Sequence, residues 1–249
     1  MVEKYLLYDG KVELSFDSDK HIYQVNGKIV DGVTSIIQIV DKSGPLMYWA
    51  VGQAMDYLRN NLKPGKALDE IEIREILEEA SKQHRFSKTR AGNIGDLVHE
   101  YIEKTIKGKK PKLPVNKQIR NSIKAFAKWA KENKLRPKLA EKKVYSKRFR
   151  YAGTMDIEGL VNGKLAIIDI KTSNGIYDEM RYQVAAYQNA REEETGKKYE
   201  ERWIIRLGKE DGEFEAVRLD DYEKDFKAFL AALILYRRKK ALKCSNNGK

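Results

Sequence analysis

Residues 154–171 read TMDIEGLVNGKLAIIDIK, and this stretch predicts a β-hairpin that brings two acidic residues together. Asn162-Gly163 stands between two apolar runs, which is the strongest short signal for a β-hairpin because a type I′ turn needs φ > 0 at both central positions. If Val161 pairs with Lys164, Asp156 faces Asp169 across the ladder, with Cβ atoms about 4.5–5.5 Å apart. Like charges placed opposite one another destabilise a sheet, so the pattern predicts a divalent cation between them.

The same register predicts what each face of the hairpin does, because side chains alternate with a period of two. Carboxylate oxygens at this spacing suit Mg²⁺ or Mn²⁺, and Lys171 could orient or help deprotonate a metal-bound water and offset the charge that builds on a phosphoryl group during its transfer. An ordinary solvated polar face with an Asp–Lys pair explains the spacing equally well. The predicted site face holds Thr154, Asp156, Glu158, Ile167, Asp169 and Lys171, and the predicted core face holds Met155, Ile157, Val161, Ala166, Ile168 and Ile170.

A helix expected over residues 92–107 carries a histidine beside its apolar stripe. His99 lies one turn after Gly95, whose missing side chain would let a backbone or a nucleotide approach. A lone His at this place is more often a boundary residue than a ligand. Beside Asp156 and Asp169, however, a neutral imidazole would favour Mn²⁺ somewhat more than an all-oxygen site does.

Two further segments place polar residues near this predicted site. Glu141 lies in a strand expected over residues 139–150, where it would hold a water beside the cation or a catalytic side chain, or pair with a nearby Lys. Gln183 and Tyr187 share one face of a helix expected over residues 178–194. Their spacing fits a Gln that contacts a phosphate or Lys171 and a Tyr that stacks on or bonds to a nucleic acid strand, and it fits an amphipathic boundary too.

Taken together, these segments resemble the core of the PD-(D/E)xK nuclease superfamily. The pattern of Asp156 followed by Asp169-x-Lys171 after a hairpin is similar to the pattern of that core. Three stretches resemble its RecB-like branch, which includes exonucleases and many phage-type nucleases: GDLVH at 95–99, EKKVY at 141–145 with YAGTMD at 151–156, and QVAAY at 183–187. The resemblance covers about residues 90–190, and four elements in the right order are more specific than any one of them.

The resemblance implies an α/β fold with a restriction-endonuclease-like core, in which helices flank a mixed central β-sheet, with an N-terminal β-hairpin and helical additions. It implies a deoxyribonuclease that uses one or two Mg²⁺ or Mn²⁺ ions, acts more as an exonuclease than as a restriction-type endonuclease, and leaves a 5′-phosphate and a 3′-hydroxyl. The metal would be bound by His99, Asp156, Asp169 and the carbonyl of Ile170. The implied catalytic residues are Asp156, Asp169, Lys171, Glu141, Gln183 and Tyr187.

The charge distribution indicates an acidic polymer as the substrate. The 249 residues carry a net charge of +12, with a pI of about 9.4. Residues 107–150 hold seventeen Lys or Arg against two Glu, a net +15, which leaves −3 for the remainder of the chain. A surface kept charged for solubility would normally mix both signs. The predicted DNA-binding residues are Lys117, Arg120, Lys124, Lys128 and Lys131 on one helical stripe, with Thr172 and Ser173 directly after Lys171.

The chain is predicted to form a single nuclease domain over residues 1–249. It comprises N-terminal strands and short helices over 1–85, a catalytic core over 86–195, and closing strands and a helix over 196–249. Asn26-Gly27 predicts a second hairpin, and separate helices are expected at 68–83 and 92–107. By resemblance, the helices that precede His99 would guide the DNA.

Several classes of protein are disfavoured by the sequence. No apolar run reaches membrane length and no secretory signal is recognised, so the expected compartment is the cytoplasm of a bacterial or phage-infected cell. Cys244 is the single cysteine, which excludes a disulfide within the chain and a four-Cys iron–sulfur cluster. The expected partner is DNA with free ends, together with a recombination or replication protein. The rival hypotheses are a sequence- or structure-specific endonuclease and a non-catalytic nucleic-acid-binding module.

Overall fold

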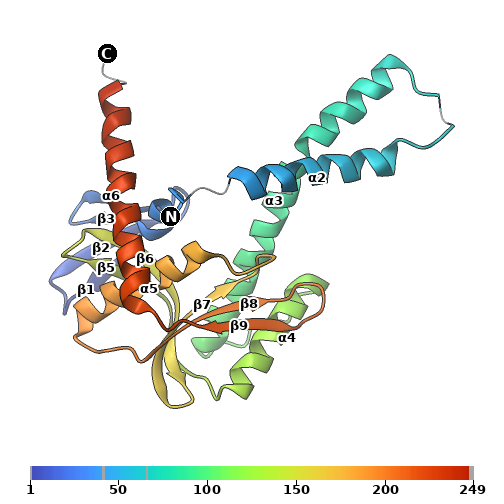
Figure 1. Cartoon of the computed structure of the whole chain (residues 1–249). Coiled ribbons are helices and arrows are strands. Elements are labelled where there is room, and N and C mark those ends of the chain that lie inside the picture. The colour runs from blue at the N-terminus through green and yellow to red at the C-terminus, as the bar shows by residue number, and fades with distance from the viewer. Residues whose placement is uncertain (1, 41–42, 66, 247–249) are drawn as a thin grey trace. The chain divides into compact units, whose positions relative to one another are not determined.

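The computed structural model describes residues 2–40, 43–65 and 67–246 (Figure 1). The elements are β1 (Val2–Leu7), β2 (Val12–Asp17), β3 (Ile22–Val25), β4 (Lys28–Gly32), α1 (Val33–Ile37), α2 (Ser43–Asn61), α3 (Glu70–Ile106), α4 (Lys117–Glu132), β5 (Arg136–Ser146), β6 (Tyr151–Val161), β7 (Lys164–Lys171), α5 (Asp178–Thr195), β8 (Glu201–Leu207), β9 (Phe214–Arg218) and α6 (Tyr222–Asn246).

The described residues form one mixed sheet of nine strands. Its order is β1-β2-β3-β4-β6-β7-β8-β9, and β5 pairs with β6 in addition. β1 to β4 form an antiparallel meander, and β4 joins the central strands by parallel pairing of Asp31 with Tyr151 and of Gly32 with Ala152. β7 and β8 are also parallel. A mixed sheet flanked by helices confirms the predicted α/β fold class, with a four-stranded meander where an N-terminal hairpin was expected.

The Asn-Gly hairpin between β6 and β7 has the predicted register. Val161 pairs with Lys164, and the ladder continues in this register as far as Ile157 with Ile168. Asn162 and Gly163 have φ values of 49° and 88°, as a type I′ turn requires. Asp156 and Asp169 are the next two residues in this register, and at this point the amide of Ile170 donates to Asp156 Oδ2 over 2.7 Å. The local turn therefore determines where both acids lie.

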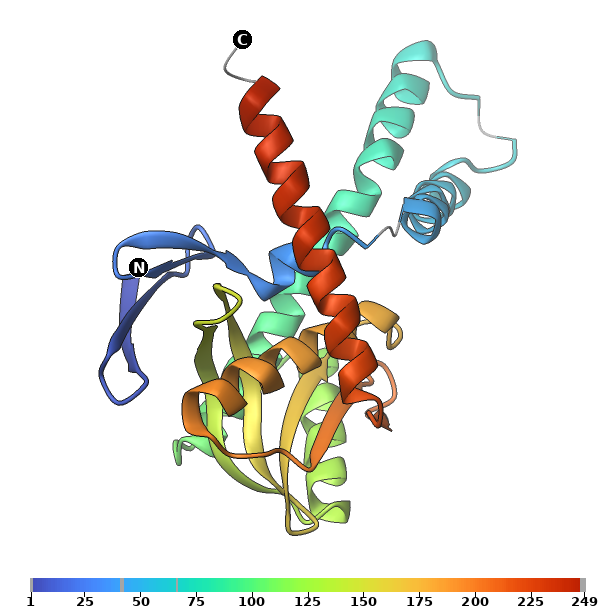
Figure 2. The same ribbon diagram turned by 60° about the vertical axis from the view of Figure 1, so that its left-hand side comes forward.

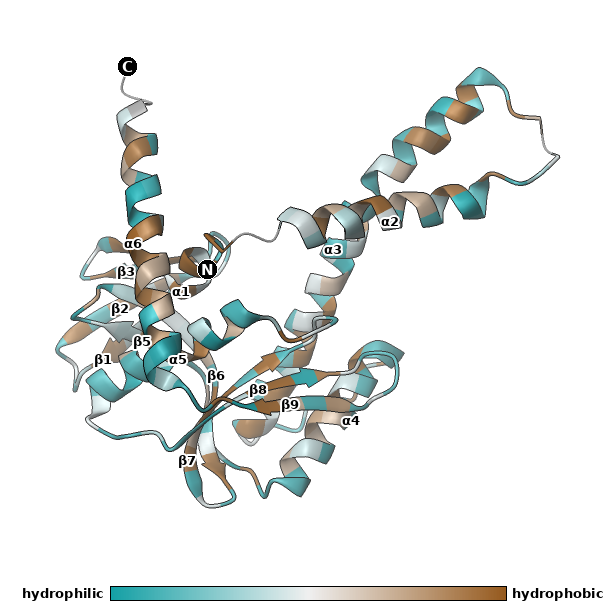
Figure 3. Ribbon diagram, viewed as in Figure 1, coloured by the Kyte–Doolittle hydropathy of each residue, from teal (hydrophilic) through white to brown (hydrophobic). Residues whose placement is uncertain are grey.

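Helices cover both faces of the central strands, with α5 in front and α4 behind in Figure 2. α5 packs on β5 to β8 and contacts α1 and α6, α1 itself contacts β4 and β6, and α4 packs on β8 and β9. Figure 3 shows the hydrophobic residues of the central strands in brown. The largest core cluster joins α5 to the sheet and includes Met155, Ile167 and Val184. On the α4 side, Trp129 is fully buried and meets Trp203 edge-on, with ring centroids 5.8 Å apart.

The prediction that only one face of the β6–β7 hairpin is core is wrong. Glu158, Ile167 and Asp169 are 4%, 0% and 1% exposed, although the alternation places all three on the predicted site face. Met155 joins the same core cluster as Ile167, although the alternation places it on the opposite face. The physical reason is that α5 covers this face, and strands between two layers of helices are buried on both sides.

Three predicted elements have different bounds in the structure. The helices expected at 68–83 and 92–107 are parts of one helix, α3, which continues from Glu70 to Ile106. Residues 84–91 contain neither Pro nor Gly, and a single helical Gly such as Gly92 costs only about 1 kcal/mol, so nothing ends the helix. β5 ends at Ser146 instead of Arg150, because Arg150 turns back and its amide donates to the carbonyl of Ser146 over 2.8 Å.

The chain divides into two compact units. One unit contains Met1–Val40 and Leu97–Lys249, and the other contains Asp41–Asp96. The second unit consists of α2 and the first part of α3, where Ser87 Oγ donates to Gln53 Oε1 over 2.6 Å. Because α3 continues from one unit into the other, this division does not decide whether they fold together. The single domain over 1–249 stays a prediction.

Candidate active site

Three potential metal ligands from three different elements converge on one point. His99 on α3, Glu141 on β5 and Asp156 on β6 each offer one ligand atom, and these atoms all lie within 4.8 Å of one another. His99 Nδ1 lies 3.5 Å from Glu141 Oε1 and 3.7 Å from Asp156 Oδ1. The side chains of His99 and Glu141 keep 27% and 23% of their surface exposed, so the cluster opens to solvent.

The backbone at Glu141 has a conformation that is unusual in a strand. Lys142 pairs with Met155 and Ala140 pairs with Ile157, so Glu141 lies opposite Asp156. Glu141 itself has a φ of 52°, in the left-handed region that non-glycine residues rarely adopt. Such strain persists only where the surrounding structure enforces it, and it is often found at functional sites. Here it occurs at the residue that completes the cluster with His99.

Asp169 and Lys171 lie on the neighbouring strand, β7. Asp169 is 1% exposed, and its Oδ2 lies 2.7 Å from Lys171 Nζ. Asp169 Oδ1 has no hydrogen-bond partner among the residues that the structure describes. A buried carboxylate oxygen without a partner is uncommon in native proteins and indicates a missing ligand or a functional role. The Lys171 side chain is 19% exposed, so it is partly accessible from solvent.

The electrostatics of these groups are those of an acid-rich cluster short of positive charge. Burial raises the pKa of Asp169 to about 6, although the Lys171 ammonium lowers it. Burial also raises the pKa of Asp156, against the opposing effect of His99. Burial lowers the pKa of His99, but Asp156 and Glu141 outweigh burial and raise it to about 9. The pKa of Lys171 is raised, because Asp169 and Asp156 outweigh its burial.

A chain of polar contacts connects Lys171 to α5. Lys171 Nζ donates to Gln183 Oε1 over 3.1 Å, and Gln183 Nε2 donates to Tyr187 Oη over 2.7 Å. The Tyr187 ring packs directly over Gly153, where an added Cβ would lie 2.6 Å from Tyr187 Cε1. Gly153 therefore makes room for the ring that holds Gln183, and Gln183 in turn holds Lys171.

The residues present fit a hard divalent cation. The donor set combines an imidazole with carboxylates, which suits Mg²⁺ or Mn²⁺. The partnerless Oδ1 of Asp169 and the raised pKa values of both aspartates mark a place where added positive charge would be stabilising. The structure thus contains a His/Glu/Asp cluster able to hold a metal, without determining which ion.

The chain has a distant similarity to a solved exonuclease. It matches a crystal structure of the alkaline exonuclease LHK-Exo from Laribacter hongkongensis at 18% sequence identity, covering 62% of this chain and 92% of that one, with a TM-score of 0.31. It matches LHK-Exo in complex with dAMP at 17% identity, covering 78% and 92%, with a TM-score of 0.30. No protein-family model and no curated protein matches the sequence.

The structure brings the sequence-predicted catalytic residues together, with two changes of role. Glu141, expected to hold a water or a side chain, stands among the potential ligands beside His99 and Asp156. Asp169 lies outside that group of three, next to Lys171. Gln183 contacts Lys171, one of its two predicted partners. Its neighbour on α5 differs more from the prediction.

The prediction that Tyr187 stacks on or bonds to a nucleic acid strand is wrong for this structure. Its ring is 2% exposed and its hydroxyl is occupied by Gln183. The physical reason is that the whole length of α5 lies against the sheet, so the face shared by Gln183 and Tyr187 points into the protein.

One residue of this neighbourhood carried no sequence signal. Tyr23 on β3 is buried, and its hydroxyl lies 2.8 Å from Thr154 Oγ1, two residues before Asp156. The contact depends on the pairing of β4 with β6, which brings together segments far apart in the chain. A hairpin pattern read locally cannot reveal such a contact.

The predicted cationic stripe on α4 is exposed as expected. Lys117, Arg120, Lys124, Lys128 and Lys131 all face solvent, while Ile119, Ala125 and Trp129 face the sheet. Lys128 pairs with Glu213 in the β8–β9 loop over 2.5 Å and lies over the Phe214 ring. The stripe is therefore partly neutralised at Lys128.

Two predicted DNA-binding residues, Thr172 and Ser173, lie in the loop after β7. Thr172 and Ser173 are partly exposed, and Ser173 Oγ donates to the carbonyl of Gly175 over 2.7 Å, so a DNA-binding role for them stays a prediction.

Cys244 is exposed and free. Across the described ranges, every helix is too short or too polar to cross a membrane.

Proposed function

We propose that this protein is a metal-dependent nuclease that hydrolyses phosphodiester bonds of DNA, and more specifically an exonuclease. The observation that carries the proposal is the convergence of His99, Glu141 and Asp156 within 4.8 Å, beside a buried Asp169 that contacts Lys171. Acidic ligands with an adjacent ammonium group are the set that phosphoryl chemistry needs, because negative charge builds on the phosphate as the bond breaks.

His99, Glu141 and Asp156 would hold the metal, with Asp169 and the carbonyl of Ile170 as further oxygen donors. A divalent cation there would polarise the scissile phosphate and make water a stronger nucleophile at neutral pH. Asp156 would use Oδ1 for this purpose, because its Oδ2 accepts a hydrogen bond from the Ile170 amide. That bond also fixes the orientation of the Asp156 carboxylate.

Lys171 would act as a hydrogen-bond donor and not as a base. Its pKa is raised, so the ammonium keeps its proton at neutral pH. Asp169 and Gln183 hold the ammonium group from two sides, at 2.7 Å and 3.1 Å, which limits its motion. In this arrangement Lys171 orients the attacking water and offsets charge on the phosphate, and Gln183 and Tyr187 are positioning residues.

The proposal of DNA as substrate rests on the resemblance of about residues 90–190 to the PD-(D/E)xK nuclease superfamily and on the exposed cations of α4. Lys117, Arg120 and Lys124 are exposed, and the neighbouring Asn121 bonds the loop that follows β8 at Lys209 and Glu210. β8 runs parallel to β7, so the loop after β8 lies at the same end of the strands as Lys171. The N-terminal half of α4 therefore offers cations at the end of the strands where the site opens.

The test is cleavage of two DNA substrates by the purified protein with Mn²⁺ or Mg²⁺. An exonuclease degrades end-labelled linear DNA, leaves covalently closed circles intact, and is stopped by EDTA. Lys171→Ala is expected to lose at least about a hundredfold in turnover. Lys164→Ala, at the exposed start of the same strand, serves as the matched control and should retain activity.

Each outcome separates the rival hypotheses. Cutting of closed circles would show an endonuclease. Equal turnover by wild type and Lys171→Ala would place the activity outside this site. Binding of DNA without turnover under any metal condition would indicate a non-catalytic binding module.

A further inference from the structure

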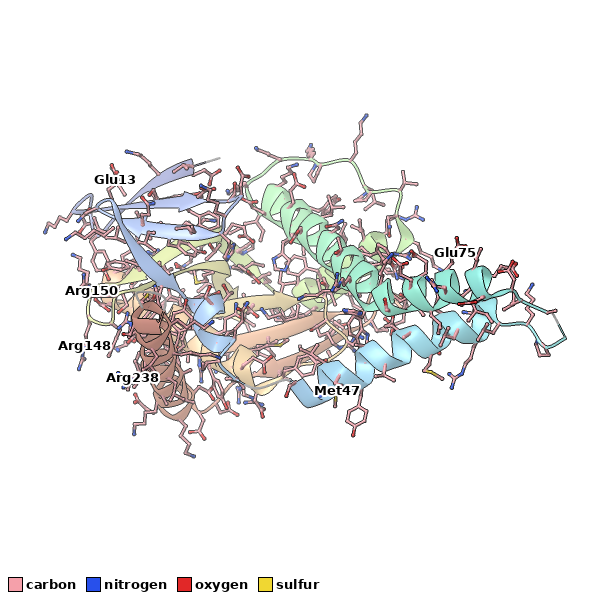
Figure 4. All side chains as sticks on the ribbon, turned by 90° about the horizontal axis from the view of Figure 1, so that it is seen from above. Glu13, Met47, Glu75, Arg148, Arg150 and Arg238 are labelled. Carbon is pink, nitrogen blue, oxygen red and sulfur yellow. The ribbon has the colours of Figure 1, made fainter. Side chains whose placement is uncertain are left out.

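A second cationic surface lies away from the candidate active site, between β4, the β5–β6 turn and α6. It surrounds a hollow of about 500 Å³ whose lining includes Lys28, Arg150, Arg237 and Lys240. Asp31 is the single acid among its lining residues. Figure 4 shows Arg148, Arg150 and Arg238 on one side of the molecule, beside α6. We call this hollow and its rim the α6 groove.

Two of the four cations have a structural task. Asp31 binds Arg237 Nε through Oδ2 and Lys240 Nζ through Oδ1, both at 2.9 Å. Arg237 also donates to the carbonyls of Phe149 and Arg150 over 2.9 Å. These contacts fasten α6 to β4 and to the β5–β6 turn, and they neutralise the only acid of the groove.

The other two cations are free to bind a ligand. Lys28 and Arg150 are exposed and form no ion pair within the described ranges of the chain. Their charge is not balanced by the lining, because Asp31 is already shared by Arg237 and Lys240. An uncompensated pair of cations over a hollow is suited to an anion with more than one charge.

The positive charge continues along α6 past the groove. A second hollow of about 290 Å³ is lined by Lys239, Lys240 and Lys243, so Lys240 borders both hollows. Residues 226–246 contain six Lys or Arg and no acid. A surface kept polar only for solubility normally carries both signs, whereas residues 237–243 carry five cations and no acid over about two turns.

We propose that the α6 groove binds the phosphate backbone of a nucleic acid strand outside the active site. A row of exposed cations along an open groove matches a polymer with regularly spaced charges, and such contacts position a strand without reading its sequence. The proposal rests on the proposed function only for its assumption that the bound strand is also the substrate.

The distance to the active site gives the proposal a measurable length scale. Asp31 pairs with Tyr151, which is five residues before Asp156 on the same strand, or about 17 Å along β6. At a rise of 3.4 Å per base pair this corresponds to about five base pairs. A dinucleotide cannot reach both places even when it is fully extended, whereas a 30-mer can.

The test compares two variants with the same change in net charge. The groove variant is Lys28→Glu with Arg150→Glu, and the control is Lys138→Glu with Lys197→Glu, two exposed lysines without ion pairs among the described residues. Binding of a fluorescein-labelled 30-mer is measured by anisotropy in EDTA at several salt concentrations. A milder pair, Lys28→Gln with Arg150→Gln, is measured as well, and thermal unfolding confirms that each protein is folded.

The groove variant is expected to bind the 30-mer at least tenfold more weakly than the control does. Its slope of log K against log[salt] should fall by about 1.4 to 1.8, the value for two lost phosphate contacts. Binding of a labelled dinucleotide should change less than threefold. Equal losses in the groove and control variants would overturn the proposal, and so would unchanged binding in the glutamine pair. Binding of wild type to phosphatidylglycerol vesicles but not to the 30-mer would also overturn it, in favour of a lipid surface.

This experiment does not depend on catalysis. If wild type fails to cleave DNA but the groove variant still binds the 30-mer more weakly than the control, the proposed function fails and the groove stands. If wild type cleaves DNA and the groove variant binds it as tightly as the control, the groove fails and the proposed function stands.

Discussion

The β6–β7 hairpin holds a buried acid near each of its ends, and the two acids differ in how their oxygens are satisfied. Glu158, near the turn, accepts hydrogen bonds from Arg191 Nε over 2.8 Å and from Tyr199 Oη over 2.7 Å. Asp169, near the open end, is as deeply buried but contacts only Lys171 and leaves Oδ1 without a partner in the described structure. A buried acid held by a guanidinium and a hydroxyl stabilises a fold, whereas one that leaves a buried oxygen without a partner is prepared for a ligand.

The largest effect is expected when Asp169 loses its charge. Asp169→Asn should reduce turnover at saturating DNA by at least about 10³-fold, or about 4 kcal/mol, because it removes a metal donor and a partner of Lys171. The free energy of unfolding without metal should not fall at pH 7, since burial penalises the charge of Asp169 more than Lys171 stabilises it and raises its pKa to about 6. Single-turnover kinetics and urea denaturation in EDTA measure the two quantities. Wild-type turnover by Asp169→Asn would break the comparison.

The opposite pattern is expected at the turn end. Glu158→Gln should lower the free energy of unfolding by about 3 kcal/mol, because it leaves the buried Arg191 guanidinium with only Glu194 as an acidic partner. Turnover at a temperature where the variant is folded should stay within threefold of wild type. A loss of turnover comparable to that of Asp169→Asn in a folded Glu158→Gln protein would show that the two ends do not have separate tasks.

The affinity for metal at the open end of the hairpin should depend on pH between about 6 and 9. The ion pair at the turn end should not change over this range. Without metal the pKa of His99 is about 9, so at pH 7 the imidazole is protonated and must lose its proton to bind a cation. Mn²⁺ affinity should therefore fall by up to about tenfold for each pH unit below 9. Arg191 stays charged throughout, since Glu158 outweighs its burial and raises its pKa.

Titration calorimetry at pH 6, 7, 8 and 9 measures this slope, and His99→Gln should flatten it between pH 7 and 9. The stability of the metal-free fold depends on pH in the opposite direction to the Mn²⁺ affinity. The charged His99 stabilises the metal-free fold fully below pH 6.5, and this contribution is lost as pH rises through about 9. A wild-type affinity for Mn²⁺ that does not change with pH would remove His99 from the ligand set.

Local sequence predicted the hairpin because its turn and register are local properties. Asn162-Gly163 determines the pairing, the pairing determines the positions of Asp156 and Asp169, and the resemblance added His99, Glu141 and Gln183. The same reasoning could not tell Glu158 from Asp169, since both lie on one predicted face. Their difference arises from Arg191 and Tyr199, which belong to α5 and the segment before β8.

Long-range packing decided the features that local sequence missed. Tyr187 points inward because α5 lies against the sheet, and the left-handed backbone of Glu141 has no counterpart in residue type. The α6 groove requires β4 to pair with β6 and α6 to reach Asp31, contacts between residues more than a hundred positions apart. Such contacts depend on how whole elements assemble, which periodicity within a window does not report.

The smallest expected effect concerns the turn that sets the register of both acids. Gly163→Ala should lower the free energy of unfolding by about 1 kcal/mol, because alanine disfavours the φ of 88° while its Cβ meets nothing within 4 Å. Gly27→Ala, in the other Asn-Gly turn with a φ of 77° and the same open space, should lose about as much. Turnover of both folded variants should match wild type within threefold. If Gly163→Ala alone reduced turnover, the changed turn would have displaced Asp169. The two ends of the hairpin would then not have separate tasks.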